Sequence, residues 1–74
     1  MLTLDQLFLG EKAIVKDFSN HDISLKLLEL GCIPGTTIQI ERISPMKDPI
    51  AVRVSGTLIA MRIEEAKSII IERQ

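Results

Sequence analysis

Apolar and polar residues alternate most regularly over residues 36–44, where they predict a half-buried strand. Ile38 and Ile40 lie on one face of this strand, and Gln39 and Glu41 lie on the other. Successive side chains of a strand point to opposite sides of a sheet, so we expect one face of this segment to pack against the core.

Four further segments show shorter patterns. Residues 12–18 suit a strand with imperfect alternation, and residues 68–72 suit a last short strand. A short helical turn is predicted over residues 4–7, because the threonine and glutamine around its start have the spacing of a capping box. Residues 64–67 form one helical turn at most. The faces expected in the two strands are Ile14 with Phe18, Ala13 with Val15 and Asp17, and, directed inward, Ile69 with Ile71.

Residues 50–55 and 58–63 are predicted to pair as a hairpin around a two-residue turn at Gly56 and Thr57. Glycine in the first position of such a turn is typical of type II′. This register places the larger apolar side chains, except that of Leu58, on one face, and a slip by one residue would destroy that separation. The expected partners are Ser55 with Leu58, Val54 with Ile59, Val52 with Met61, and Ile50 with Ile63. The opposite face carries Ala51, Arg53, Ser55, Leu58, Ala60 and Arg62.

A polar break before residue 23 introduces the only substantial helix. Asn20 or Asp22 is expected to cap its start, and Leu30 is expected near its end. At about 100° per residue, Ile23, Leu27 and Leu30 fall within a narrow arc. We therefore expect these three side chains to face the core.

Two leucines of this helix point away from that arc. Leu25 and Leu28 lie roughly 140° to 200° from Ile23 around the helix axis. One interpretation is a broad buried face at the edge of the fold, since a helix on a small domain normally buries one stripe. The other interpretation is an exposed apolar patch that contacts a partner.

The stretch 27–35 is expected to set the angle between the helix and the strands that follow it. Gly31 occupies the place of a helix-ending glycine, where a left-handed backbone costs glycine little. Cys32 would then fold back onto Leu27 in a Schellman-type end. Pro34-Gly35 is typical of the centre of a type II turn.

These elements predict one domain over residues 1–74 of a mainly β class. About five short strands with turns between them and one inserted helix suggest a small barrel, because closure removes exposed strand edges. Phe8 and Phe18 are the only aromatic residues, so isoleucine, leucine and valine must fill most of the core. Residues 44–49 contain two prolines and are expected to form a loop.

The charge balance gives little support to nucleic-acid binding. Nine basic and ten acidic side chains give a net charge of -1, whereas affinity for nucleic acid depends on neutralising phosphates. Arg53 and Arg62 share the outer face of the hairpin, with Arg42 and Lys47 expected nearby. This patch lacks the aromatic side chains on which bases stack, so an ordinary solvated face or a patch for acidic groups of a protein partner is favoured.

No catalytic, metal or cofactor site is predicted. The single histidine, His21, and the single cysteine, Cys32, do not have the spacing of a ligand pair. His21 and Asp22 with Glu29 could hold a divalent ion, but a solvated helix entrance is the more ordinary interpretation. Cys32 is expected to make a small apolar contact at the helix end, because a nucleophile would need a base beside it.

The chain is expected to be soluble and cytoplasmic. One cysteine allows no intramolecular disulfide, and no basic residue precedes Lys12 as a signal peptide would require. No apolar run approaches the roughly 18 residues of a transmembrane helix. What remains is a non-enzymatic binding module.

Three motifs, in order along nearly the whole chain, resemble the FeoA family. LLELGCIPGT at residues 27–36 and SPMKDPI at residues 44–50 are similar to the family patterns LLxLGxxPG and PxxDPI. LIAMRIEEA at residues 58–66 is similar to the final strand and turn of these proteins.

The resemblance implies an SH3-like barrel that acts in bacterial ferrous iron uptake as a cytoplasmic companion of FeoB, a membrane iron transporter with a GTP-binding domain. It implies no cofactor and carries over no metal ligand. The residues expected to contact the partner are Leu25, Leu27, Leu28, Met46 and Lys47.

Two alternatives stay open. The fold also resembles the C-terminal domain of DtxR-type metal-dependent repressors, which suggests a metal-responsive regulatory or sensor domain. The winged helix-turn-helix of those repressors has no counterpart in this sequence, so DNA binding is not expected. A homo-oligomer formed through strand edges or the helix is the third interpretation.

Overall fold

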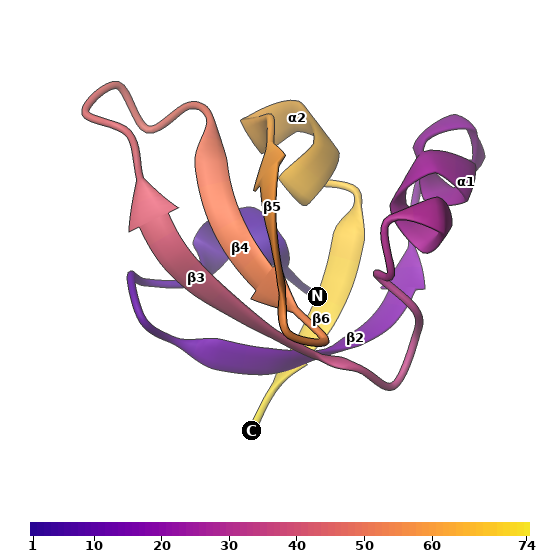
Figure 1. Ribbon diagram of the computed structural model, residues 1–74. Coiled ribbons are helices and arrows are strands. Elements are labelled where there is room, and N and C mark those ends of the chain that lie inside the picture. The colour runs from indigo at the N-terminus through magenta and orange to yellow at the C-terminus, as the bar shows by residue number, and fades with distance from the viewer.

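The alternating segments of the sequence form one six-stranded antiparallel sheet in the computed structural model, which describes residues 1–74 (Figure 1). The strand order is β1-β6-β2-β3-β4-β5. The helix α1 (His21–Glu29) connects β2 to β3, and these two strands pair with each other. The strands are β1 (Leu2–Thr3), β2 (Lys12–Phe18), β3 (Thr37–Ile43), β4 (Ile50–Val54), β5 (Thr57–Met61) and β6 (Ile69–Arg73). The helices are the 3-10 helix η1 (Leu4–Gln6) and the α-helices α1 (His21–Glu29) and α2 (Ile63–Ala66).

Two irregularities bend the long strands, which sweep around the molecule in Figure 1. The pairing of β2 with β6 shifts at Lys16, and the pairing of β3 with β4 shifts at Glu41. A bulge of this kind adds one residue to a strand and increases its local twist. In β2 the bulge also turns Phe18 toward the core, on the same side as Val15. The prediction that Ile14 and Phe18 share a face was therefore wrong, because it assumed unbroken alternation.

The predicted hairpin forms, but its turn lies one residue earlier than predicted. Val54 pairs with Thr57 around a two-residue turn at Ser55 and Gly56, whose φ angles are 50° and 81°. Two positive φ angles define a type I′ turn in place of the expected type II′. The observed pairs are Arg53 with Leu58, Val52 with Ile59, Ala51 with Ala60, and Ile50 with Met61. Each partner is shifted by two residues, so the side chains of β4 and β5 keep their predicted faces.

One hydrophobic core lies inside the curled sheet. Sixteen buried apolar residues form it, and almost all of them are aliphatic. Leu4 and Leu7 from the N-terminal turn are among them, and so are Ile69 and Ile71 from β6, which were predicted to point inward. Ile63, predicted at the end of a strand, starts α2 and packs against this core only in part.

The helix α1 begins as predicted, but its buried face is rotated. The Asn20 side chain accepts a hydrogen bond from the backbone N–H of Asp22 at 2.9 Å and caps the helix. Leu27 is fully buried and Ile23 partly, but Ser24 takes the place expected for Leu30. Leu30 is exposed because the helix ends there and the chain turns away.

The end of α1 has the predicted Schellman geometry. The backbone N–H of Cys32 donates to the carbonyl of Leu27 at 2.9 Å, and that of Gly31 donates to the carbonyl of Leu28 at 3.1 Å. Gly31 has a φ of 99°, and Cys32 and Leu27 are both fully buried. The type II turn follows, with the N–H of Thr36 donating to the carbonyl of Ile33 at 3.0 Å.

Replacing Gly31 by alanine is expected to lower the free energy of unfolding by about 1 to 2 kcal/mol, because the left-handed conformation crowds a Cβ atom against its own backbone. Beyond the two adjacent residues, no atom lies within 4 Å of that Cβ position, so the loss would come from the φ of 99°. Urea unfolding measures it. Gly31→Asn is the matched control and should retain more stability, since asparagine tolerates this conformation better; equal stability of Gly31→Ala and the wild type would contradict the account.

Candidate functional site

Two leucines project from the outer side of α1. Leu25 is 68% exposed and Leu28 is 38% exposed. They are three residues apart, so they are neighbours on the helix surface. They are exposed because the opposite side of the helix, with Ser24 and Leu27, is buried. We call Leu25 and Leu28 the α1 leucine face.

Acidic residues flank the α1 leucine face, and an ion pair connects the helix to α2. Asp22 and Glu29 are exposed, three residues before and four residues after Leu25. On the same helix the Lys26 ammonium lies 2.7 Å from a carboxylate oxygen of Glu65 in α2. This ammonium, together with the backbone N–H of Arg62, holds the pKa of the Glu65 carboxyl below its usual range. The α1 leucine face is thus presented on a helix tied to its neighbour.

Leu27 does not belong to this surface. Its side chain is fully buried, so the expectation that it contacts a partner was wrong. The same residue satisfies the other expectation for it, which is packing against the core at the helix end.

Met46 and Lys47 lie in the loop between β3 and β4, apart from the α1 leucine face. In Figure 1 this loop and α1 stand on opposite sides of α2. Met46 is 86% exposed. The structure therefore divides the predicted contact residues between two separate surfaces.

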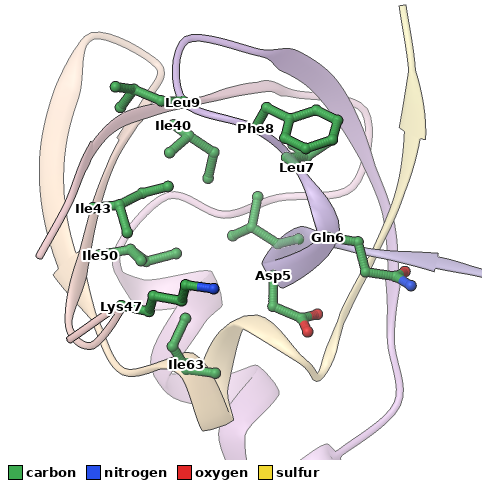
Figure 2. A pocket seen from close by; sticks show the side chains of 11 residues that line it. Asp5, Gln6, Leu7, Phe8, Leu9, Ile40, Ile43, Lys47, Ile50 and Ile63 are labelled. Atoms are coloured by element: carbon green, nitrogen blue, oxygen red, sulfur yellow. The ribbon is translucent and has the colours of Figure 1, made fainter. Parts of the chain in front are cut away.

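A pocket of about 450 Å³ opens beside this loop and is lined mainly by apolar side chains. Lys47 projects over it from one wall, and the turn η1 forms the opposite wall (Figure 2). The residues around it are Leu4, Asp5, Gln6, Leu7, Phe8, Leu9, Ile40, Ile43, Lys47, Ile50 and Ile63. Sequence reasoning missed this pocket, although one signal was present: Phe8, one of two aromatic residues, falls outside every periodic element and is 74% exposed.

Two of the four residues in the predicted basic patch, Arg53 and Arg62, form ion pairs, whereas Arg42 and Lys47 form none. Arg53 lies 2.7 Å from a carboxylate oxygen of Glu41, and Arg62 lies 3.5 Å from one of Asp48. Acidic neighbours on the same surface offset both guanidinium charges. Surface pairs of this kind contribute little to stability, typically about 0 to 1 kcal/mol.

The histidine and the cysteine lie at opposite ends of α1, as expected. His21 is exposed at its first turn, and Cys32 is buried after its last. No three His, Cys, Asp or Glu side chains lie together in a group that could hold a metal ion. Burial raises the pKa of the Cys32 thiol to about 11.

Cys32 is expected to resist thiol reagents in the folded chain. With a pKa near 11 only about one thiol in a thousand is ionised at pH 8, against roughly a quarter for an ordinary cysteine. Its reaction with 5,5′-dithiobis(2-nitrobenzoate) should be slower than that of the urea-unfolded chain by about 100-fold or more. Equal rates in the folded and unfolded chain would mean that the thiol is accessible and the helix end is not packed as described.

Residues 2–73 match the family model described as the FeoA domain. The chain belongs to the FeoA domain family. It is therefore a domain associated with ferrous iron transport. The resemblance inferred from the three sequence motifs is confirmed.

A curated relative of this FeoA-family chain is a fusion protein of Porphyromonas gingivalis that joins Fe(2+) transport protein A to the Fe(2+) transporter FeoB. The two sequences are 28% identical over 72 residues, which cover 96% of this chain and 8% of the fusion protein. The chain thus spans a small part of the length of that relative.

Solved FeoA structures share the fold. The FeoA-like protein of Clostridium acetobutylicum is 33% identical with a TM-score of 0.90, covering 97% of this chain and 85% of that one. FeoA of Stenotrophomonas maltophilia, solved with zinc and described as a procaryotic SH3 domain protein, is 31% identical with a TM-score of 0.84. It covers 97% of this chain and 91% of that one. The expected mainly β, SH3-like fold is confirmed.

The expected likeness to DtxR-type repressors is also found. The crystal structure of T. acidophilum IdeR is 27% identical with a TM-score of 0.84, and the match covers 99% of this chain and 34% of IdeR.

None of the helices of the FeoA-family chain has the length and apolar composition needed to cross a bilayer.

Proposed function

We propose that this FeoA-family chain is a non-enzymatic regulatory binding module of ferrous iron uptake. It contacts the cytoplasmic part of a FeoB-type transporter and acts by binding, without catalysing a reaction. The observation that carries the proposal is the α1 leucine face, on which Leu25 and Leu28 remain exposed although the core is complete without them.

The energetics of the α1 leucine face favour a macromolecular contact. Fully burying a leucine side chain contributes about 1.5 to 3 kcal/mol relative to leaving it exposed. Leu25 has more of this surface left to bury than Leu28. The flanking carboxylates of Asp22 and Glu29 suit a partner with an apolar centre and basic residues around it, since complementary charges at the rim steer association.

Two relatives support the choice of partner. In the Porphyromonas gingivalis protein, Fe(2+) transport protein A and FeoB share one polypeptide, and such a linkage raises the effective concentration of one part for the other. The Stenotrophomonas maltophilia protein has been suggested to act as a bacterial ferrous iron transport activating factor. Both statements concern those proteins, and we extend them to this chain as part of the proposal.

A pull-down of the chain with the cytoplasmic domain of a FeoB-type transporter tests the proposal. We expect the wild-type chain to be retained and Leu28→Asp to be retained more weakly. Circular dichroism checks that the variant is folded. We expect it to fold, because the Leu28 side chain is exposed. A folded Leu28→Asp chain with unchanged retention would remove the α1 leucine face from the interaction, and no retention of the wild type would contradict the proposed partner.

Calorimetric titration of the chain with ferrous, manganous and zinc ions distinguishes this function from that of a metal-responsive sensor. Under our proposal no saturable micromolar binding that depends on His21 is expected. Such binding, lost in His21→Ala, would favour the sensor.

A further inference from the structure

The pocket beside the β3–β4 loop is a concave apolar surface separate from the α1 leucine face. Its volume of about 450 Å³ lies within the usual range of ligand pockets. Its floor is formed by core residues such as Ile40 and Ile50, which are held rigidly by the sheet. The pocket is therefore part of the folded framework.

Lys47 is the only cationic residue that lines the pocket. Its ammonium projects over the apolar side chains (Figure 2) and has no carboxylate within 4 Å. Asp5, on the opposite wall, accepts a hydrogen bond from the hydroxyl of Thr3. The lining thus carries one charge of each sign, and neither side chain forms an ion pair. The Lys47 ammonium lies over the apolar interior, whereas the Asp5 carboxylate points away from it (Figure 2).

The backbone at Lys47 has an uncommon conformation. Its N–H donates to the carbonyl of Ser44 at 2.7 Å, and its φ is 67°. A non-glycine residue at positive φ is uncommon, and glycine would adopt this conformation at lower cost. A lysine here keeps its side chain over the pocket despite that cost.

We propose that this pocket docks an extended peptide segment of a protein partner in which apolar residues flank a carboxylate. The apolar side chains enter the pocket, and the carboxylate pairs with the Lys47 ammonium. This site is independent of the proposed contact through α1, and it does not require that the partner be a transporter.

The rim of the pocket favours a peptide over a small anionic molecule. Phe8 and Leu9, which line the pocket, are strongly exposed and extend its apolar surface outward. Aromatic side chains are enriched in protein interfaces. A small fatty acid could fill the interior but would leave these rim residues exposed.

Titration of the isotopically labelled full chain with two synthetic peptides, followed by amide chemical shifts, tests the site. One peptide is acetyl-SLLELS-amide, and the other carries lysine in place of the glutamate. We expect saturable shifts at Phe8, Ile43 and Lys47, with binding of the glutamate peptide tighter by about three- to fivefold, as for an exposed ion pair.

Variants at position 47 separate the charge from the fold. Lys47→Gly should fold well, because glycine suits its φ of 67°, and should lose the preference for the glutamate peptide. Lys47→Glu should invert the preference toward the lysine peptide. Lys12→Glu changes the net charge by the same amount in β2, away from the pocket, and should keep the wild-type preference.

Several results would overturn the proposal. They are shifts that fall outside the pocket, equal affinity of the wild type for both peptides, and octanoate binding as tightly as the glutamate peptide. Leu28→Asp should leave this titration unchanged, so failure of the pocket site and failure of the α1 contact are distinguishable.

Discussion

Replacing both Leu25 and Leu28 by aspartate is expected to weaken binding to the cytoplasmic domain of a FeoB-type transporter by about 100-fold or more. The double variant loses two apolar contacts and places two carboxylates between Asp22 and Glu29. A loss of about 1.4 kcal/mol at each position, modest for a central interface residue, already gives this factor. Isothermal titration calorimetry measures both dissociation constants.

Leu58→Asp is the matched control for this experiment. Leu58 is 54% exposed, comparable to the two leucines of α1, but it lies on the outer face of β5. Its substitution adds the same kind of charge and should leave the affinity unchanged. Equal losses in the control and the double variant would show that any apolar surface serves, and would contradict a specific role for α1.

The second large effect is expected at Leu27, which lies between Leu25 and Leu28 in the sequence but on the buried side of α1. Leu27→Ala should lower the free energy of unfolding by about 2 to 5 kcal/mol, because it removes buried methyl groups and leaves a cavity. The side chain is fully buried, and the fold of a short chain has little stability to spare. Urea denaturation followed by circular dichroism measures the change.

Leu25→Ala provides the comparison for Leu27→Ala. It removes the same atoms from an exposed position of the same helix, so we expect a change within about 0.5 kcal/mol. Similar losses for the two variants would mean that the buried and exposed faces of α1 are wrongly assigned.

Much of the fold was predictable because burial leaves a strong pattern in a short chain. The alternation around Ile38 and Ile40 predicted β3, and Gly31 with Cys32 predicted the end of α1. Both depend on local chemistry, namely the two-residue period of a strand and the conformational freedom of glycine. The family motifs include this same helix end, so the resemblance and the physical argument agree there.

The errors have equally physical causes. The hairpin turn was displaced because a partner shift of two residues leaves every side chain on the same face, so the hydrophobic pattern does not distinguish the two registers. Ser55 has a φ of 50°, which serine adopts rarely, so the sequence did not mark it as a turn residue as clearly as it marked Gly56. Phe18 was assigned to the wrong face because one bulge residue, Lys16, reverses the alternation.

The candidate surfaces were predictable only in part. Helical spacing separated Leu25 and Leu28 from the core, and their exposure contradicts the alternative of a broad buried face. Their contact with a partner stays a prediction. The pocket was not predictable, because its walls come from η1, the ends of β3 and β4, and α2, which only the folded chain brings together. Lys47 was predicted as a contact residue without any indication that it lies over that pocket.

The most direct test of the account is the footprint of the transporter's cytoplasmic domain on the isotopically labelled chain, measured by amide chemical-shift and intensity changes. The account predicts that the largest changes fall on α1 and centre on Leu25 and Leu28, while the outer face of the hairpin around Arg53 and Leu58 is unaffected. Changes centred on the hairpin, or no changes at a saturating concentration of the transporter domain, would contradict it.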